Sequence, residues 1–452
     1  MANLIKLRKG LTINLAGAAA KEVTSLSTDG EYALVPDDFV GVKPKVVVKP
    51  GDTVKAGDFL FVNKNAQQVG FASPVSGTVT DVLRGDRRKV LSVKVKADKE
   101  QVFKSFEPKD VDHLTAEQVI NSLLEAGLFG YIEQMPYAVS TTPNTKPAGI
   151  FVSALRDMPL QADFDFTVKG NEAEFQAGIT ALSKIAPVYL GIGSETTNKA
   201  LTDAKDAEVT IYSGKCPAGN VDVQINHTHP VCKGEVVWTV DPDSVVFFGR
   251  LFLSGKVNLT KTIAVAGSEI NEPAYLSTLV GTPISRIVNN KLKHNEHVRV
   301  INGNPLTGEP VTDMQQTYLG AHRSEVTAIP EGDNANELLG WIRPRTNEFS
   351  VSHSYFSWLF GKKKQYVLDA RIKGGERHMI MSGEYDKVLP MDIYAEYLIK
   401  AIITGDIDKQ EQLGIYEVRP EDFALAEFVD SSKLPLQQIV RNGLDILRKE
   451  NA

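Results

Sequence analysis

The sequence predicts a multidomain protein that joins β structure to α/β layers and ends in helices, and three patterns indicate this. Short strand patterns separated by Pro-Gly-Asp and Ser-Gly turns fill residues 48–79. Strand and helix patterns alternate over residues 148–212, which is typical of a parallel α/β layer. A strongly amphipathic helix pattern covers residues 436–449. The length of 452 residues is more than one compact domain usually holds.

The composition excludes some classes of function. The formal net charge is −6 and 42% of the residues are hydrophobic, so the chain is globular and lacks the basic stripe of a nucleic-acid-binding protein. No run of about 20 apolar residues, the length of a membrane-spanning helix, occurs. The apolar stretch 11–20 follows Lys6, Arg8 and Lys9, but it is short and contains polar residues, unlike a secretory signal. We therefore expect a cytoplasmic chain.

A small β unit is predicted at residues 48–79, and its strand and turn pattern resembles the biotinyl/lipoyl carrier fold, a hammerhead-shaped scaffold. In carriers a modified lysine lies on the hairpin between the two halves of this unit. The matching hairpin here is Asn65-Ala66-Gln67, and Lys64 is out of register. The pattern therefore predicts the scaffold without its swinging arm, which disfavours a carboxylase-type carrier enzyme.

A Rossmann-like domain is predicted next. Thr115 and Gln118 have the spacing of a capping box at the start of a helix, and Gly127 can end that helix. Expected strands cover 148–155, 188–190 and 208–212, and expected helices cover 171–185 and 195–204. Gly191-Ile192-Gly193 follows a strand, but the third glycine of a dinucleotide loop is missing. We expect an ordinary strand-to-helix turn there.

The last two parts of the chain, after about residue 257, have different sequence patterns. Expected strands at 261–265 and 298–301 bracket the turn Gly281-Thr282-Pro283-Ile284, where a threonine can cap a helix and a proline can start it. This small module resembles a β-grasp, soluble-ligand-binding unit. The end of the chain is expected to be helical, with helices at 391–403 and 436–449. The expected domains are 1–104 (N-terminal segment and hammerhead), 105–256 (Rossmann-like), 257–328 (β-grasp module) and 329–452 (helical).

Four residues with metal-binding side chains lie near one another in the sequence: Cys216, His227, His229 and Cys232. A structural zinc site uses such a set. Their spacing is not that of a zinc finger, and neighbouring prolines favour ordinary loops. Two cysteines are also too few for an iron–sulfur cluster held by four thiolates. We therefore predict no metal site.

An aromatic-rich stretch at residues 349–360 precedes Lys362-Lys363-Lys364. Two interpretations remain open. The stretch could be a buried strand followed by a basic loop, or it could be an exposed surface that faces a partner or a membrane. The buried strand is favoured, because exposed aromatic patches are rarer.

Motifs spread in order along the chain give a family resemblance. They are Lys9-Gly10-Leu11, Val40-Gly41-Val42-Lys43-Pro44, Cys216-Pro217-Ala218-Gly219, Gly249-Arg250-Leu251-Phe252, Gly340-Trp341, Asp386-Lys387-Val388-Leu389-Pro390-Met391-Asp392 and Glu421-Asp422-Phe423-Ala424-Leu425. With the domain order, they resemble the A subunits of Na+-translocating NADH:quinone oxidoreductases. These proteins are related to the C subunit of the Rnf complex and to the flavin-binding NADH-oxidising subunit of complex I.

The resemblance implies a place and a set of partners. It implies a peripheral subunit on the cytoplasmic side of the bacterial inner membrane, in a complex that couples NADH oxidation and quinone reduction to sodium export. The partners would be membrane subunits and flavin-bearing subunits, which hold the flavins and the iron–sulfur centre. Quinone is a possible ligand, and the isolated chain is not expected to be catalytic.

Two departures from the relatives bear on cofactors. Where flavin-binding relatives have a glycine-rich phosphate loop, residues 127–136 keep two glycines but carry bulky Phe129, Tyr131 and Met135. Where electron-carrying relatives have cysteine-rich motifs, residues 428–435 contain no cysteine. We therefore expect no flavin, no cluster and no other redox cofactor in this chain.

The altered loop leaves two interpretations open. Phe129, Tyr131, Met135 and Tyr137 could line an apolar quinone slot with a hydrogen-bond donor, closed by Phe39 and the rest of loop 32–39. Alternatively, these side chains fill the space that flavin occupies in the relatives. The second interpretation is favoured, and it leaves open a purely structural docking subunit with no ligand of its own.

Overall fold

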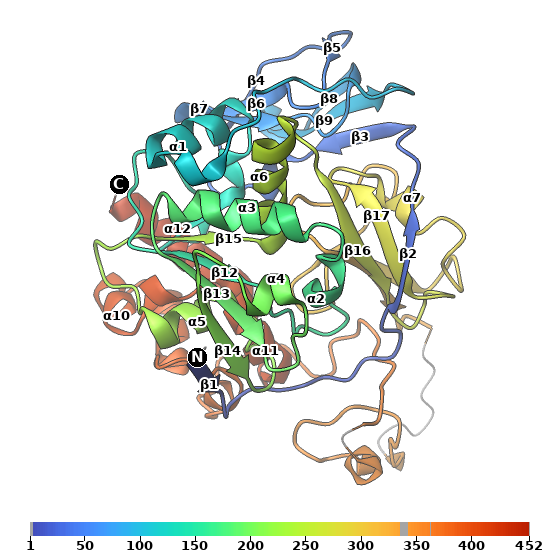
Figure 1. Ribbon diagram of the computed structural model, residues 1–452. Helices are drawn as coiled ribbons and strands as arrows, with labels where there is room; N and C mark the ends of the chain where they lie inside the picture. Colours follow the sequence, from blue (N-terminus) through green and yellow to red (C-terminus); the bar gives the residue numbers. More distant parts are fainter. Residues whose placement is uncertain (1–2, 335–341, 362, 452) are drawn as a thin grey trace.

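The computed structural model describes residues 3–334, 342–361 and 363–451. Two large sheets, an N-terminal β unit and a helical C-terminal part pack against one another (Figure 1). In the described part of the chain, no helix is both long and apolar enough to cross a bilayer. The predicted Gly340-Trp341 motif and Lys362 lie outside the described residues.

The first large sheet has seven strands in the order β1-β14-β13-β12-β15-β10-β11. They are β1 (Asn3–Lys6), β10 (Ile132–Met135), β11 (Val139–Ser140), β12 (Ile150–Ser153), β13 (Val188–Gly193), β14 (Glu208–Ser213) and β15 (Val237–Val240). The strands from β1 to β15 are parallel, whereas β10 is antiparallel to β15 and β11. The alternation of strands and helices predicted for this region is confirmed.

Helices pack on this sheet and, in the case of α1, beside β7 (Ala66–Ala72) of the N-terminal β unit, and two of them approach unusually closely. They are α1 (Ala116–Glu125), α2 (Phe164–Thr167), α3 (Glu172–Ser183), α4 (Lys199–Thr202), α5 (Val221–Thr228) and α6 (Pro242–Ser254). A Cβ atom on Gly178 of α3 would lie 2.1 Å from the carbonyl oxygen of Val245, and one on Gly249 of α6 would lie 1.7 Å from that of Glu174. Glycine at both positions therefore lets α3 and α6 pack backbone to backbone.

The local start and stop signals explain which helices were predicted well. The capping box of α1 is present, with Gln118 N donating to Thr115 Oγ1 at 3.3 Å and Thr115 N donating to Gln118 Oε1 at 2.9 Å. Helix α4 is shorter than the predicted 195–204. Thr197 N and Asn198 N donate to the Asp165 carboxylate instead, so the helix begins only after Asn198.

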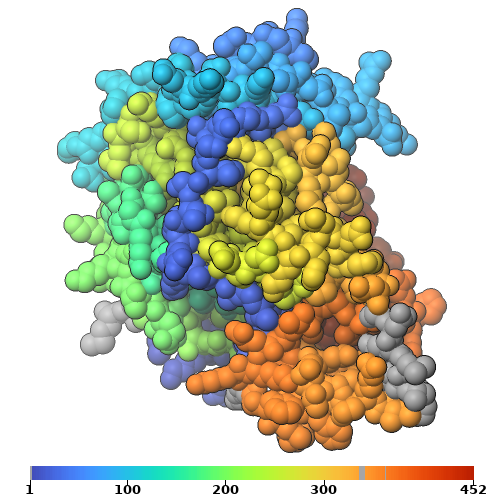
Figure 2. All heavy atoms as spheres, turned by 90° about the vertical axis from the view of Figure 1, so that its right-hand side faces the viewer, coloured from blue at the N-terminus to red at the C-terminus, as the bar shows by residue number. Residues whose placement is uncertain are grey.

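The second large sheet has six strands in the order β19-β18-β20-β16-β17-β2. They are β2 (Ala20–Ser25), β16 (Thr260–Ala266), β17 (Ala274–Leu279), β18 (Val298–Asn302), β19 (Glu309–Pro310) and β20 (Glu325–Pro330), with α7 (Ile284–Ile287) packed nearby. Pro283 rather than Thr282 occupies the N-cap position of α7, where it makes no side-chain capping hydrogen bond. The blue N-terminal segment lies across this yellow module in Figure 2. The chain start thus supplies one strand to each large sheet, β1 and β2.

The N-terminal β unit consists of two small sheets, β3-β9-β8-β5 and β4-β6-β7. Their strands are β3 (Glu31–Leu34), β4 (Pro44–Val46), β5 (Thr53–Val54), β6 (Phe59–Asn63), β7 (Ala66–Ala72), β8 (Gly77–Arg84) and β9 (Val90–Ala97). The hairpin turn between β6 and β7 carries Lys64, which is exposed.

The C-terminal helices are α8 (Tyr385–Val388), α9 (Ala395–Thr404), α10 (Ile407–Gln412), α11 (Ala424–Val429) and α12 (Leu436–Glu450). Helix α12 matches the predicted 436–449. Helix α9 starts later than the predicted residue 391, because the preceding bend is tied to α5 by a hydrogen bond from Asp392 N to Asn226 Oδ1 at 3.1 Å. The buried strand favoured for residues 349–360 is wrong: this stretch forms bends and the exposed 3-10 helix η6 (Phe356–Phe360).

Candidate functional site

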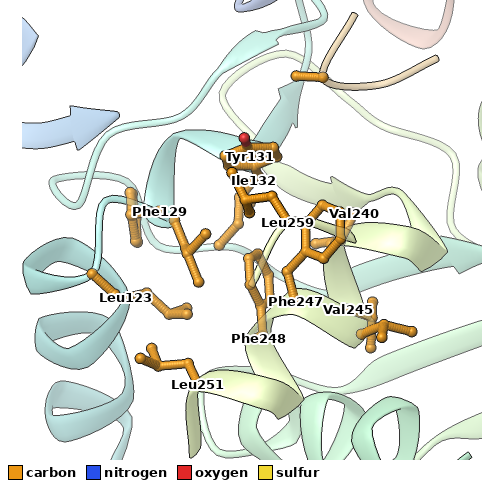
Figure 3. Close-up of a cluster of buried hydrophobic side chains, with 14 of the residues drawn as sticks. Leu123, Phe129, Tyr131, Ile132, Val240, Val245, Phe247, Phe248, Leu251 and Leu259 are labelled. Carbon is orange, nitrogen blue, oxygen red and sulfur yellow. The ribbon is translucent and has the colours of Figure 1, made fainter. Parts of the chain in front are cut away.

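The altered loop is a short 3-10 helix, η4 (Phe129–Tyr131), whose two aromatic side chains are fully buried. We call Phe129 and Tyr131 the aromatic plug. Gly127 ends α1 with a left-handed conformation, φ 70°. Gly130 lies so close to the ring of Phe71 that a Cβ atom would be 2.3 Å from it. These two glycines thus serve the turn and the close packing, and the side chains of Phe129 and Tyr131 lie in the buried cluster (Figure 3).

The two rings of the aromatic plug pack against different parts of the chain. The ring of Phe129 meets Trp238 of β15 edge to face, with centroids 5.6 Å apart. The ring of Tyr131 has Phe39 at 5.1 Å and Phe247 of α6 at 6.0 Å. Figure 3 shows Tyr131 turning its hydroxyl away from the Phe248 side of the cluster. The plug therefore joins the N-terminal β unit to the seven-stranded sheet.

The structure brings together only part of the predicted set of site residues. Phe39, Phe129 and Tyr131 belong to one buried cluster. Met135 is buried in another cluster, on β10. Tyr137 is half-buried with φ 86°, and its ring lies 6.5 Å from that of Tyr416 in the helical C-terminal part.

Two polar atoms, one in the plug and one beside it, have no hydrogen-bond partner within the described structure. They are Tyr131 Oη and His322 Nε2, both buried, on rings whose centroids are 5.7 Å apart. Burial raises the pKa of Tyr131 and lowers the pKa of His322, so both groups are neutral near pH 7. A neutral phenol and a neutral imidazole in an apolar setting can each hydrogen-bond a carbonyl oxygen or a hydroxyl group.

A carboxyl group lies close to the same junction. Asp38 Oδ2 accepts a hydrogen bond from Ala321 N at 3.0 Å. Removal from water raises the pKa of Asp38 to about 7. Sequence reasoning included the loop 32–39 but missed Asp38 and His322 as site residues. Neither has a motif around it, and only the fold brings residues 38, 131 and 322 together.

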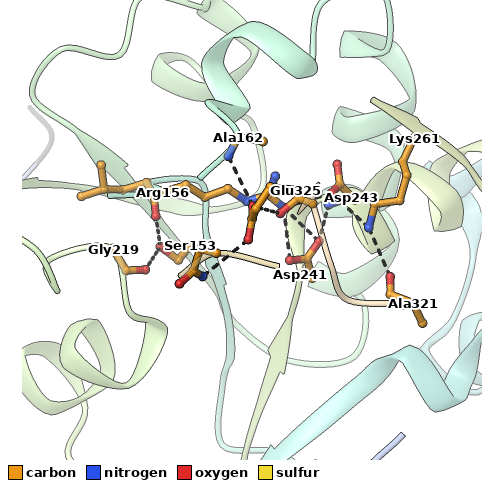
Figure 4. A network of polar contacts seen from close by, with 12 residues as sticks. Ser153, Arg156, Ala162, Gly219, Asp241, Asp243, Lys261, Ala321 and Glu325 are labelled. Carbon is orange, nitrogen blue, oxygen red and sulfur yellow. Dashed lines mark hydrogen bonds and ion pairs between the residues drawn. The ribbon is translucent and has the colours of Figure 1, made fainter. Parts of the chain in front are cut away.

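A second polar centre lies at the carboxyl ends of β12 and β15 (Figure 4). The sheet order reverses between these strands, and ligands of open α/β sheets bind at such a point. Here Arg156 fills it: its Nη2 is 3.2 Å from the Asp241 carboxylate and 3.0 Å from Asp243 Oδ2. Lys261 from the second sheet reaches Asp243 Oδ2 at 3.6 Å. The crevice is therefore closed by ion pairs that link the two large sheets.

The electrostatics of this network follow from burial and pairing. Burial disfavours the charge on Arg156, but Asp243 and Asp241 outweigh it and raise the pKa of the guanidinium. Burial works against the Asp243 carboxylate as well, and Arg156 and Lys261 hold its pKa below the ordinary value. Among the described residues, Glu325 on β20 has no ion pair as close as these, and burial raises its pKa. The network suits a fixed junction rather than a proton-transfer site.

The predicted metal candidates do not gather. Cys216 is buried with its Sγ 3.5 Å from Met158 Sδ, whereas Cys232 is exposed. His227 Nδ1 is 2.8 Å from Val223 O, and His229 Nε2 is 2.7 Å from Glu235 Oε1. Over residues 3–334, 342–361 and 363–451, no group of three or more His, Cys, Asp or Glu residues is arranged to hold a metal ion.

The segment without cysteines, residues 428–435, comprises the end of α11 and the turn that follows it. Asp430 is buried and accepts hydrogen bonds from Ser432 N at 3.1 Å and Leu434 N at 2.8 Å. Beside it lies a groove of about 960 Å³, lined from the 349–355 and 368–378 segments and from α11. The carboxylate therefore holds the backbone turn closed from within.

Comparison with known proteins gives matches along most of the chain. Three family models match: the NqrA N-terminal barrel-sandwich hybrid domain at residues 5–98, the NqrA second alpha/beta domain at 114–257, and the NQRA C-terminal domain at 262–313. A solved structure of an NAD+-reducing [NiFe]-hydrogenase aligns with 49% of this chain and with 48% of the hydrogenase chain, at 14% identity. Its TM-score of 0.34 is too low to support an argument.

Full-length relatives settle the family. The A subunit of the Na(+)-translocating NADH-quinone reductase of Haemophilus influenzae (strain PittEE) is 32% identical over 452 residues, which is 99% of this chain and 100% of the relative. The protein of the same name from Yersinia pestis bv. Antiqua (strain Angola) is 32% identical over 451 residues, with the same coverage. The chain therefore belongs to the family of Na+-translocating NADH-quinone reductase A subunits.

Proposed function

We propose that the chain is a peripheral subunit that completes the quinone end of a Na+-translocating NADH:quinone reductase and carries no redox cofactor of its own. Its place is the cytoplasmic side of the bacterial inner membrane, on membrane subunits and beside flavin-bearing subunits. The full-length similarity to A subunits supports the role in the complex. The expected domain division, a hammerhead, a Rossmann-like domain, a β-grasp module and a helical part, belongs to the same proposal.

The full burial of the aromatic plug carries this proposal. Flavin-binding relatives need bare backbone at this loop, whereas Phe129 and Tyr131 here fill it and contact Trp238 and Phe247. A flavin phosphate at that loop would have to displace both rings, which would lose the free energy of burying them. The loop thus favours a fixed junction over an electron-carrier site.

A role for this junction in quinone binding is supported by the two unpaired polar atoms. An unsatisfied buried hydroxyl costs free energy, so Tyr131 Oη and His322 Nε2 are better accommodated when a ligand bonds them. Quinone carbonyls are acceptors of the right kind. Because the rings fill the site, a quinone head group would have to displace a neighbour such as Phe39.

A second candidate function is a purely structural docking subunit. It is favoured by the separation of the predicted lining residues, since Met135 and Tyr137 lie in clusters apart from Tyr131. In that case Tyr131 is only a plug. The two candidates differ in one measurable quantity, the effect of the Tyr131 hydroxyl on quinone affinity.

The test is Tyr131→Phe in the reassembled complex, with the apparent quinone affinity and the thermal melting of the purified chain measured together. Because Tyr131 Oη has no partner in the described structure, folding should be unchanged or slightly stabilised. If the hydroxyl bonds a quinone carbonyl, affinity should fall about tenfold, or about 1.4 kcal/mol. An unchanged affinity would contradict the quinone role and leave the docking role.

A matched control is Tyr212→Phe. Tyr212 is also buried in the seven-stranded sheet, but its hydroxyl donates to Gln224 O at 3.3 Å. This substitution should cost about 1 kcal/mol of stability and leave quinone affinity unchanged. A loss of affinity in both variants would indicate a general effect of weakened packing rather than a lost bond to quinone.

A further inference from the structure

Four large side chains on η6 stand out into solvent. Phe356, Trp358, Leu359 and Phe360 are between 48% and 62% exposed, and we call them the aromatic tip. The one buried residue of this helix is Ser357. Figure 1 shows the orange segment that carries them extending below the rest of the molecule. The exposed side chains therefore form a projection and not part of a groove wall.

The base of the aromatic tip is fixed. Ser357 O accepts a hydrogen bond from Tyr366 Oη at 3.5 Å. Tyr366 is buried, and its backbone pairs with the N-terminal segment through Tyr366 N to Asn14 O at 2.8 Å and Ala16 N to Tyr366 O at 2.9 Å. The ring of Phe349 packs edge to face on Tyr366 at 5.4 Å. The exposure of the tip is thus built into an ordered attachment.

The surroundings of the aromatic tip are basic. Lys363 and Lys364 follow η6, and Lys364 Nζ lies 4.3 Å from the ring centroid of Phe360. Residues 342–382 contain eight lysine and arginine residues against three acidic ones, although the whole chain has a net charge of −6. The positive charge is therefore concentrated in the same segment as the exposed aromatic side chains.

We propose that the aromatic tip inserts into the head-group region of an anionic lipid bilayer. A tryptophan, phenylalanines and a leucine flanked by lysines suit that interface, where the rings sit at head-group depth and the cations meet lipid phosphates. A protein partner is less well matched, because lysine is depleted in protein interfaces. The inference deepens the proposed function and rests on it in one respect, that the partner proteins lie in a membrane nearby.

Another exposed aromatic pair provides a matched contrast. Tyr394 and Tyr397, at the start of α9, are 68% and 58% exposed. Their neighbours in the chain include Asp392 and Glu396, and no lysine cluster follows directly. Glu396 is buried, so its charge does not reach this surface, and the surface has no basic cluster to attract anionic lipid. Tyr394 and Tyr397 therefore serve as a control: their aromatic rings are as exposed as those of the tip, but their surroundings are not basic.

The test is flotation of the purified full chain with vesicles of phosphatidylglycerol and phosphatidylethanolamine, and with vesicles of phosphatidylcholine alone. The wild type should float with the anionic vesicles only, and added salt should weaken binding. Trp358→Ser with Phe360→Ser should reduce binding about tenfold or more. Lys363→Gln with Lys364→Gln should remove most of the salt dependence. Tyr394→Ser with Tyr397→Ser should bind as the wild type does.

Thermal melting of each variant checks that it is folded, which matters most for Lys364, whose half-buried side chain donates to Asn347 Oδ1 at 3.3 Å. A wild type that does not float with anionic vesicles would overturn the proposal, as would a tip variant that floats normally. If the wild type fails to float while the tip variant fails to join the membrane subunits, the tip is a protein-docking surface and the lipid proposal is wrong. The vesicles contain no partner proteins and no quinone, so quinone reduction by the reassembled complex tests the proposed function separately.

Discussion

The aromatic plug and the aromatic tip are built from the same kinds of side chain, but the plug is buried and the tip is exposed. Phe129 and Tyr131 have no exposed surface, whereas the side chains of the tip are about half exposed. The plug is covered by Phe39, Trp238, Phe247 and His322, which come from four different parts of the chain.

Within the described residues, the ring contacts of the tip come from nearby in the sequence. His353 stacks on Trp358 at 5.5 Å, and Lys364 lies over Phe360. An aromatic run is therefore not an indication of burial by itself. What decides its environment is whether distant segments fold over it, and a run left uncovered on an ordered base is a candidate interface.

The largest expected effect is at the plug. Phe129→Ala removes a fully buried ring and leaves a cavity, so the free energy of unfolding should fall by about 3–5 kcal/mol. Denaturant unfolding of the purified chain measures it. A loss below about 1 kcal/mol would mean that the neighbouring rings collapse into the space, and the plug would not be what stabilises the junction.

A smaller effect is expected at the charged group beside the plug. Burial raises the pKa of Asp38 to about 7, above its ordinary value. The folded chain therefore holds a proton that the unfolded chain has lost, and the stability contributed by this group falls as pH rises from about 4 to about 7. Asp38→Asn removes the carboxylate charge that burial penalises and keeps an oxygen acceptor for Ala321 N. It should therefore stabilise the chain by about 1 kcal/mol above pH 7.

Unfolding at about pH 5 and about pH 8 tests the sign. The gain in Asp38→Asn should be larger at the higher pH, and the exposed neighbour Asp37→Asn should change stability by less than about 0.5 kcal/mol at both. An equal effect of Asp38→Asn at the two pH values would show that its charge is not what burial penalises.

The smallest effect is expected at the tip. Phe360→Ala should change the free energy of unfolding by less than about 0.5 kcal/mol, because the ring is 61% exposed. Because both substitutions replace a phenylalanine by alanine, comparing Phe360→Ala with Phe129→Ala separates the effect of burial from the effect of residue type. A loss comparable to that of Phe129→Ala would mean that the tip is packed in solution and is not a free surface.

Local signals predicted the elements that depend on local chemistry. The capping box at Thr115 and Gln118, the left-handed Gly127, and the amphipathic pattern of α12 each fix a helix end or a helix face from nearby residues. The parallel layer was predictable for the same reason, since its strands and helices alternate in short, clearly separated patterns.

The rest depended on contacts between distant residues. The pairing of β1 with β14 and of β2 with β17 joins segments some two hundred residues or more apart, which no local pattern specifies. His322 and Asp38 reach Tyr131 for the same reason. The five predicted lining residues were chosen by position in a loop, and strand β10 then carried Met135 to a different cluster.

The side chains of Phe129 and Tyr131 fill the loop at which we propose that no flavin phosphate binds. The most direct measurement is the visible absorption spectrum of the purified full chain, together with the flavin released by acid. We predict a colourless protein with no flavin in the extract. A spectrum with flavin or iron–sulfur bands at one cofactor per chain would contradict the account, because the aromatic plug would then have to open to admit it.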